Sequence, residues 1–309
     1  MSSEVIRDGS AAGPIPDIPA LRPVSRTVFA DRAARLQQLA PRHALEEYLR
    51  FAAALAAAQH EVLQQLPGPT LPDALTLRRC REHGLPPLAV DVHPRDAWWR
   101  NALHALLDRL DLAALPPQAR ERVGDLRTAT GNALERAATH LLCGAYAELD
   151  PGSAPFLAAA LQAYWTRMAL DLDLAPGRIG VPEQPGLCAV CGSPPVASVV
   201  RIGGAEQGLR FLVCSLCGAE RHLVRVKCSA CDSTKGISYY GIEGASPAVK
   251  AETCDQCKTY LKIFYLEKDS GIEPCADDLA TMTLDMLVAD KGYDRVGPNL
   301  YFLPGNAAQ

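Results

Sequence analysis

The sequence predicts an α+β protein, in which an N-terminal all-α helical bundle precedes two tandem rubredoxin-like or zinc-ribbon-like β modules and a short C-terminal helix. Three observations lead to this fold class. The first half of the chain is rich in Ala and Leu, and its apolar residues recur at helical spacings of three and four. Eight of the 11 cysteines then occur as Cys-x-x-Cys pairs. Short β-branched and aromatic runs separate these pairs, as expected of strands.

The 309 residues exceed one typical core, so several domains are expected. A proline-rich start with few apolar residues predicts a flexible tail. A Pro- and Gly-rich stretch before the cysteines predicts a linker. The expected divisions are a tail at 1–25, a helical domain at 26–175, a first module at 183–226, a second module at 227–270, and a C-terminal helix and tail at 271–309.

Capping residues and prolines mark the expected helices. Ser25 can cap the first helix, and Pro41 is expected to open the second. Pro94 precedes a third amphipathic run, and a fourth, which extends to about Leu149, is expected to be interrupted near Gly124 and Gly131. Ser153 precedes the last. The segment is therefore predicted to form a bundle of five to seven helices.

The cysteine pairs follow a repeated spacing. Each module has the pattern Cys-x-x-Cys, 22 intervening residues and Cys-x-x-Cys, and the two patterns are offset by 40 residues. Chance produces such a repeat far less often than one isolated pair, so it indicates two related modules. The candidate metal ligands are Cys188, Cys191, Cys214, Cys217, Cys228, Cys231, Cys254 and Cys257.

These cysteines are predicted to hold two metal ions. Two Cys-x-x-Cys turns supply four sulfur ligands in a tetrahedron, which suits zinc or iron. Gathered thiolates repel one another unless a cation neutralises them. Disulfides and a thioredoxin-type redox couple fit four regular pairs less well. The 40-residue offset favours sequential pairing of the turns, while crossed pairing stays open.

The segments around the pairs are predicted to be strands. Residues 196–202 and 209–213 flank a Gly-Gly turn and indicate a hairpin, and residues 237–242 and 260–266 have similar composition. Residues 222–227 are also expected to be a strand. Its histidine and the nearby basic side chains of Arg221, Arg225 and Lys227 are expected on a solvated edge.

The two sites are expected to differ. Gly192 and Gly218 follow the second cysteine of each pair in the first module, and glycine permits positive φ. Asp232 and Lys258 take these positions in the second module. Because Lys tolerates positive φ poorly, the second site is expected to be looser or more exposed.

The rest of the chain offers fewer signals. Asp277 and Asp278 are expected in the first turn of the C-terminal helix, where carboxylates complement the helix dipole. Leu279, Met282, Met286 and Leu287 are expected to form an apolar stripe along this helix. The unpaired Cys80, Cys143 and Cys275 are expected to pack as small apolar side chains.

The charge balance argues against a nucleic-acid partner. The net charge is −4, and residues 183–268 hold ten basic and eight acidic side chains. With two divalent ions, each bound by four thiolates, the net charge of this region becomes about −2, which does not suit a nucleic-acid partner.

No apolar run is long enough to span a bilayer and no secretory leader is found, so no membrane insertion and a cytoplasmic location are expected. Phosphate loops, nucleophile elbows and His-Glu-x-x-His helices are absent, which predicts no catalytic site.

Several segments together resemble the formate dehydrogenase accessory protein FdhE family. They are the helical start at 32–59, the four cysteine pairs in their order, Asp277-Asp-Leu-Ala-Thr281 and the closing Gly297-Pro-Asn299. The resemblance implies a cytoplasmic protein, not itself an enzyme, that is needed for activity of exported molybdenum-containing formate dehydrogenases and acts on their catalytic subunit. It also implies a rubredoxin-like region associated with iron. Zinc stays an alternative, and a homo-oligomer is left open.

Several functional hypotheses follow. The main one is a maturation factor that binds the formate dehydrogenase catalytic subunit through the metal modules and the nearby helical surface. The alternative is a rubredoxin-like redox carrier or reductase partner, since iron held by four sulfurs can cycle between two charge states. The metals can instead be purely structural. A zinc-ribbon nucleic-acid-binding protein is disfavoured by the charge.

Overall fold

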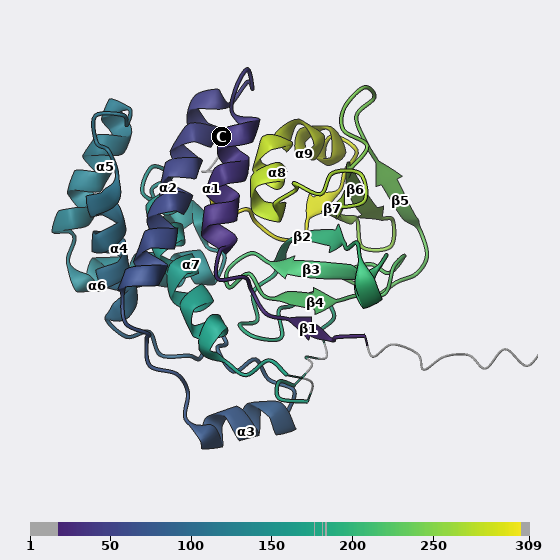
Figure 1. Ribbon diagram of the computed structural model, residues 1–309, viewed down its shortest axis with the longest axis horizontal. Coiled ribbons are helices and arrows are strands. Elements are labelled where there is room, and N and C mark those ends of the chain that lie inside the picture. Colours follow the sequence, from purple (N-terminus) through teal and green to yellow (C-terminus); the bar gives the residue numbers. More distant parts are fainter. Residues whose placement is uncertain (1–17, 176, 181, 183, 304–309) are drawn as a thin grey trace, which may run out of the picture.

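The computed structural model describes residues 18–303, apart from 176, 181 and 183. A helical part and a sheet part lie side by side, and the C-terminal helices pack against the sheet (Figure 1). This arrangement confirms the predicted α+β class, with its N-terminal bundle and cysteine-rich β region. Residues 1–17 and 304–309 of the two expected tails lie outside the described residues.

Seven α-helices and a 3-10 helix make up the helical part between residues 28 and 171. The helix α2 begins later than expected, because Arg42 has a φ of 64° and breaks any helix that starts at Pro41. The helix α5 runs through Gly124, since one glycine costs a helix only about 1 kcal/mol. The bounds are α1 Val28–Leu39, α2 Glu46–Gln65, α3 Ala74–Glu82, α4 Trp98–Arg109, α5 Pro117–Thr128, α6 Gly131–Leu142, η1 Tyr146–Glu148 and α7 Ala154–Asp171.

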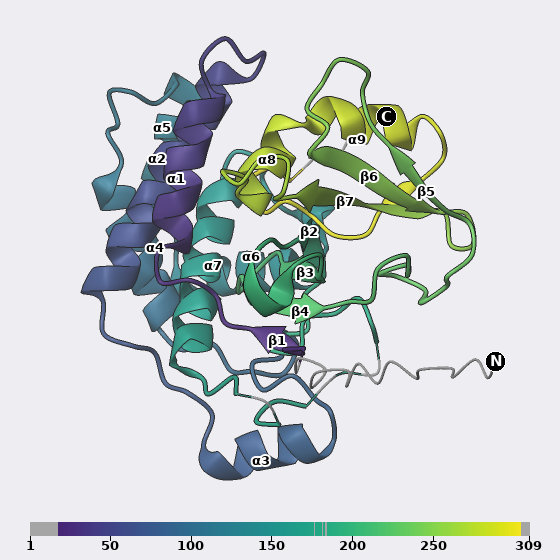
Figure 2. The same ribbon diagram turned by 45° about the vertical axis from the view of Figure 1, so that its right-hand side comes forward.

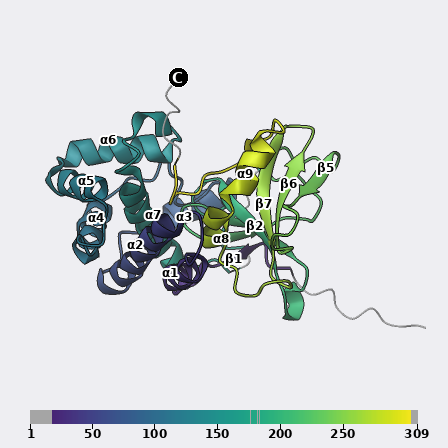
Figure 3. The same ribbon diagram turned by 90° about the horizontal axis from the view of Figure 1, so that it is seen from above.

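The helix α7 lies at the centre of the bundle. It contacts α2, α4 and α6, which surround it in the view from above (Figure 3). Its many alanines are buried and allow these helices to approach closely. The same continuous core includes the cysteines of the first module, such as Cys191 and Cys217. The helical part therefore supports the first module directly.

All described strands belong to one sheet. Its order is β1-β4-β3-β2-β7-β6-β5, with β8 beside β7. The antiparallel hairpin β2–β3 serves the first module, and the antiparallel strands β5, β6 and β7 serve the second. Parallel pairing of β2 with β7 joins the two modules. The bounds are β1 Leu21–Arg22, β2 Pro195–Val200, β3 Arg210–Cys214, β4 Glu220–His222, β5 Ile237–Tyr240, β6 Val249–Cys254, β7 Thr259–Tyr265 and β8 Asp294–Arg295.

One sequence expectation, the strand at 222–227, is wrong at the sheet edge. Leu21 and Arg22 of the expected tail, which is predicted to be disordered or to lie over the surface, pair with β4 at this edge. The expected strand at 222–227 ends at His222, and Val224 and Val226 are exposed. Val226 has a φ of 60°, which a strand cannot accommodate. The segment after β4 is thus a connection between the modules.

The C-terminal region forms two helices instead of one. The helices α8 (Pro274–Ala280) and α9 (Met282–Ala289) lie against the sheet at β2 and β6 (Figure 2). Lys262 of β7 donates to the carbonyl oxygens of Asp278 and Thr281, which ends the first helix. The chain turns there, so the expected apolar stripe is wrong at its far end: Met286 and Leu287 are exposed.

Candidate metal centres

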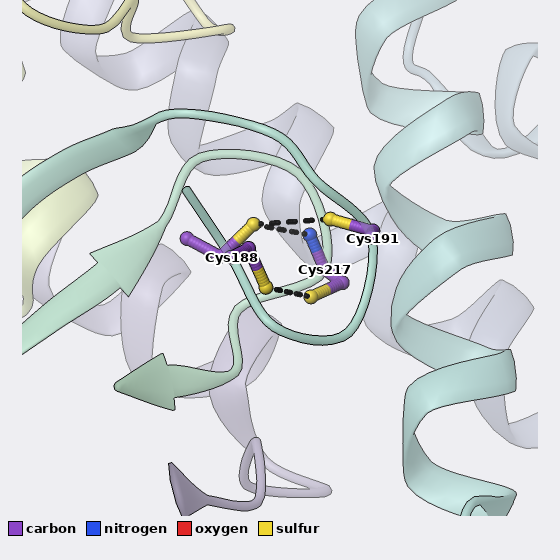
Figure 4. A group of neighbouring side chains, drawn as sticks. Cys188, Cys191 and Cys217 are labelled. Carbon is purple, nitrogen blue, oxygen red and sulfur yellow. Dashed lines mark hydrogen bonds between the residues drawn. The ribbon is translucent and has the colours of Figure 1, made fainter. Parts of the chain in front are cut away.

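The first candidate site gathers the four cysteines of the first module. The sulfur atoms of Cys188, Cys191, Cys214 and Cys217 all lie within 4.8 Å of one another, and all four residues are buried. Cys188 Sγ lies 3.6 Å from Cys217 Sγ, and Cys191 Sγ lies 3.4 Å from Cys214 Sγ. Figure 4 shows the labelled side chains directed toward one another from two loops. The structure thus brings together the turns of one module, in sequential order.

Local backbone geometry explains this convergence. Gly192 N donates to Cys188 O, and Gly192 and Gly218 have φ values of 76° and 73°. In each Cys-x-x-Cys turn, this left-handed glycine closes the turn and directs backbone N–H groups toward the cysteine sulfur. Val190 N lies 3.4 Å from Cys188 Sγ, and Leu216 N lies 3.4 Å from Cys214 Sγ. Such donors stabilise negative charge on the sulfur atoms.

The helical part holds the first site from outside its module. Gln162 Nε2 of α7 donates to Ser215 O at 2.7 Å, and Thr166 Oγ1 donates to Cys217 O. On the other turn, Leu88 N donates to Val190 O at 2.9 Å. The first site is therefore fixed by secondary structure that is distant in sequence.

The second candidate site has the same ligand arrangement but more solvent contact. Its four sulfur atoms, from Cys228, Cys231, Cys254 and Cys257, also lie within 4.8 Å of one another. Cys231 is exposed and Cys257 is half-buried, which confirms the expectation of a more exposed second site. The positions after each pair nevertheless keep the left-handed turn.

The left-handed positions of the second site are not held by glycine. Asp232 has a φ of 66° and Lys258 a φ of 56°. Each side chain forms an ion pair close by: Asp232 Oδ2 with Lys227 Nζ at 2.6 Å, and Lys258 Nζ with Asp255 Oδ1 at 2.9 Å. The backbone strain of a non-glycine residue is thus tolerated where neighbouring contacts hold the turn.

The thiol pKa values show why each cluster suits a cation. Hydrogen bonds from Cys191, Cys214 and Cys217 hold the pKa of Cys188 well below its usual value. Burial raises the pKa values of Cys214 and Cys217, and the neighbouring sulfurs raise them further. In the second site, burial raises the pKa of Cys228 to about 12. Four thiolates in one cluster therefore need a cation to neutralise their charge. With such a cation bound, the four sulfurs form the soft ligand set that zinc and iron prefer.

The remaining candidate residues lie elsewhere. Cys80, Cys143 and Cys275 join neither cluster; Cys275 is buried as expected, whereas Cys143 is exposed. His222 packs its ring edge-to-face against Phe211. The predicted solvated edge is wrong for Arg221, whose Nη1 donates to the carbonyl oxygens of Gln184 and Leu187.

Sequence reasoning did not identify Arg210 and Lys262, two basic side chains that are almost fully buried in the sheet. The available signal was the continuous apolar run around each of them, since Leu209 and Phe211 flank Arg210, and Leu261 and Ile263 flank Lys262. Such runs are typical of strands that are buried on both faces.

The comparisons with known proteins agree with this geometry. Three family models match the chain consecutively: FdhE, N-terminal, over residues 18–178; FdhE, central domain, over 187–225; and FdhE, C-terminal domain, over 226–302. The chain belongs to the FdhE family. One cysteine module falls in the central match and the other in the C-terminal match.

Relatives of similar length support this membership. The "Protein FdhE homolog" of Stutzerimonas stutzeri is 44% identical over 92% of each chain. The "Protein FdhE homolog" of Pseudomonas aeruginosa is 43% identical over 99% of each chain. The crystal structure of the FdhE protein from Pseudomonas aeruginosa has a TM-score of 0.85 and 41% identity, over 93% of this chain and 100% of that one. The family fold thus extends across nearly the whole chain.

Within the residues that the structure describes, none of the helices combines the length and the apolar character that crossing a bilayer requires.

Proposed function

We propose that the protein is an accessory factor for formate dehydrogenase maturation, and that it binds the catalytic subunit of that enzyme in the cytoplasm. Membership of the FdhE family supports the accessory role. The observation that carries the proposal is the unequal exposure of two otherwise similar four-cysteine clusters. A buried cluster suits a structural ion, whereas a cluster at the surface can meet a partner. The protein itself is proposed to catalyse no reaction.

The eight clustered cysteines are proposed as ligands of two metal ions. Iron is favoured by the family resemblance, and zinc is the alternative. The divisions 183–226 and 227–270 are proposed as the two metal modules, between a helical domain at 26–175 and the C-terminal segment 271–309. In this proposal the first ion holds the module on the helical part, and the second ion shapes a contact surface.

A cleft of about 1030 Å³ is proposed as a second contact surface for the catalytic subunit. The starts of α2, α5 and α7 line this cleft, together with Phe302 and Leu303. Phe302 is 37% exposed and packs edge-to-face on Tyr48. Four carboxylates and one guanidinium also line the cleft, but Arg50 pairs with Glu46, and Arg122 pairs with Glu121 and Asp150. Glu47 is therefore the carboxylate placed to meet a partner, and a mainly apolar segment with a basic side chain fits the cleft best. The acidic residues are Glu46, Glu47, Glu121 and Asp150, and the basic residue is Arg122.

Co-purification with the catalytic subunit tests the proposal. Cys228→Ser/Cys231→Ser is expected to reduce capture and activation of the subunit while the protein stays folded. Phe302→Ala/Glu47→Lys is expected to reduce capture while the metal content is unchanged. Glu82→Lys, an exposed charge reversal at the end of α3 that lines neither the cleft nor a cluster, is the control. Full capture and activation by both test variants would contradict the proposal.

A redox role is a second candidate, favoured by the exposure of Cys231. An iron ion near the surface can exchange electrons with a partner, whereas zinc cannot. A visible thiolate-to-iron absorption band that bleaches with reductant would support this role. A colourless zinc protein that activates the dehydrogenase fully would exclude it.

A further inference from the structure

We infer that Arg210 is a positioning residue through which the first module assembles the second metal site. The inference rests on the proposed metal binding and adds an order of assembly to it. Arg210 is the first residue of β3, and Cys214 of the first site is the last residue of the same strand. One short strand therefore connects a ligand of the first site to the support of the second.

Arg210 reaches both halves of the second site. Its Nη1 donates to Lys227 O at 2.9 Å, directly before Cys228. Its Nη2 lies 2.7 Å from Glu252 Oε1, two residues before Cys254. Cys228 and Cys254 begin the two turns that supply the four sulfurs. A single guanidinium thus sets the separation of these turns.

Further contacts extend this support to the ligand turns. Lys227, whose carbonyl Arg210 holds, pairs through its own Nζ with Asp232 Oδ2. Asp232 is the left-handed residue that closes the first turn of the second site. On the other side, Tyr239 Oη donates to Glu252 Oε2 at 2.9 Å. Arg210 therefore acts through Lys227 on one turn and through Glu252 on the strand that carries the other.

The support is unequal between the two sites. Contacts from α7 and from the segment at Leu88 also hold the first site, and its cysteines are part of the main core. Within the described residues, the first module holds the second site through Arg210, and the C-terminal segment holds its other turn: Tyr293 Oη donates to Asp255 Oδ1 at 2.8 Å, and Asp294 N donates to Lys258 O at 2.8 Å. The first site should therefore bind its ion more tightly and fill first, while any coupling between the two affinities is equal in both directions.

Energetics favour a positioning role over a stabilising one. The Arg210 side chain is fully buried and that of Glu252 is 4% exposed. Arg210 Nε and Nη2 also have no hydrogen-bond partner among the described residues, so Nη2 meets Glu252 only as an ion pair. Desolvation of such a pair offsets much of its attraction, and apolar replacements of both partners are often neutral or stabilising. The variant Arg210→Met/Glu252→Leu can thus retain the sheet while it releases the turns.

Cobalt(II) titration of the metal-free protein, followed by the thiolate and d–d absorption bands, tests the inference. Wild type should bind two equivalents. Arg210→Met/Glu252→Leu should weaken the second equivalent at least about tenfold and leave the first unchanged, as for other residues that orient metal ligands. The control is Arg32→Met/Glu273→Leu, which removes another buried Arg–Glu pair, away from both clusters, and should change neither equivalent.

Cysteine variants test the order of assembly. Cys228→Ser/Cys231→Ser should remove the weaker cobalt equivalent and keep the tighter one, whereas Cys188→Ser/Cys191→Ser should remove the tighter one. If the double apolar variant fails to fold, Arg210→Lys replaces it, because Lys keeps the charge but cannot span both acceptors. Unchanged second-site affinity in the folded variant, or tighter cobalt binding at the second site than at the first, would overturn the inference alone. No cobalt binding by wild type would overturn both the inference and the proposed metal sites.

Discussion

The backbone of Gly186 lies against the carbonyl oxygen of Ser229, so closely that a Cβ at residue 186 would overlap this oxygen. Gly186 lies two residues before Cys188, and Ser229 lies inside the first turn of the second site. The chain leading into one cluster therefore touches the turn of the other. Glycine is required here for space, because any side chain would displace the opposing backbone.

Gly186→Ala is therefore expected to weaken metal binding at the second site. The added methyl group must push the Cys228–Cys231 turn away from its partner turn, and small displacements of ligand supports cost about tenfold or more in affinity. Zinc titration against a competing chelator would measure both sites. The first site should change little, because α7 also holds it.

A matched glycine variant controls for this change. Gly124 lies within α5, and a Cβ there would meet no atom within 4 Å. Gly124→Ala should raise the free energy of unfolding by about 0.5–1 kcal/mol and leave metal affinity unchanged. If both variants and wild type bind metal at the second site with the same affinity, the close backbone approach at Gly186 does not affect that site.

Lys262→Met is expected to destabilise the C-terminal half strongly. The ammonium group of Lys262 is fully buried, 2.5 Å from Asp285 Oδ2 and 3.3 Å from Asp278 Oδ1. It also satisfies the carbonyl oxygens that end α8. Its removal leaves buried carboxylates with less compensation, which costs about 3–5 kcal/mol. Arg295 still pairs with both acids, so the lower part of that range is expected.

Denaturant unfolding of Lys262→Met and Lys262→Met/Asp285→Leu measures this cost. The second substitution removes one of the uncompensated charges and should recover part of the loss. Lys291→Met, on an exposed residue, is the control and should change stability by less than about 0.5 kcal/mol. A loss as small in Lys262→Met as in this control would contradict the assigned role of the buried ammonium.

The regular features of the fold could be predicted from sequence because each has a local signal. Ser153 marks the start of α7, and the Gly203-Gly204 turn marks the hairpin of β2 and β3. The cysteine spacing likewise led to both clusters, since each Cys-x-x-Cys turn is a local structure. Local sequence signals were thus sufficient to predict the helices, the hairpin and the turns that carry the cysteines.

Features that depend on distant contacts could not be predicted. Parallel pairing of β2 with β7 joins segments about 65 residues apart, and the residues of neither strand indicate which strand it pairs with. Arg210 and Lys262 resemble surface residues in the sequence, because their acidic partners come from other elements. The break between α8 and α9 has the same origin, since Lys262 imposes it from the sheet.

Asp278 should make stability depend on pH. Burial alone would raise its pKa, but Lys262 and Arg295 lower it below the ordinary value of 3.8. A lowered folded pKa means that the stabilisation is fully present above the unfolded pKa and is lost as the pH falls through the folded pKa. The free energy of unfolding should therefore fall below about pH 4.

Denaturant titrations of wild type and Asp278→Asn between pH 3 and 7 test this dependence. The acid-induced loss should be smaller in Asp278→Asn, because the variant has no carboxylate to protonate there. Both proteins keep the same cysteine clusters, so any metal loss in acid affects them alike. Asp290→Asn, an exposed site, should follow wild type. The same acid slope in all three proteins would refute the assignment.

The two clusters should release metal at different rates. Cys231 is exposed and Cys257 half-buried, whereas all four sulfurs of the first site lie in the core, so a chelator reaches the second ion first. Zinc release to a chromogenic chelator should show two phases of about equal amplitude. The fast phase should be missing in Cys228→Ser/Cys231→Ser, with little change in Tm. Cys188→Ser/Cys191→Ser should instead lower Tm markedly, because it removes the ion that ties the sheet to the helices. A single release phase in wild type, or loss of the slow phase in the second-site variant, would contradict the unequal roles of the two centres.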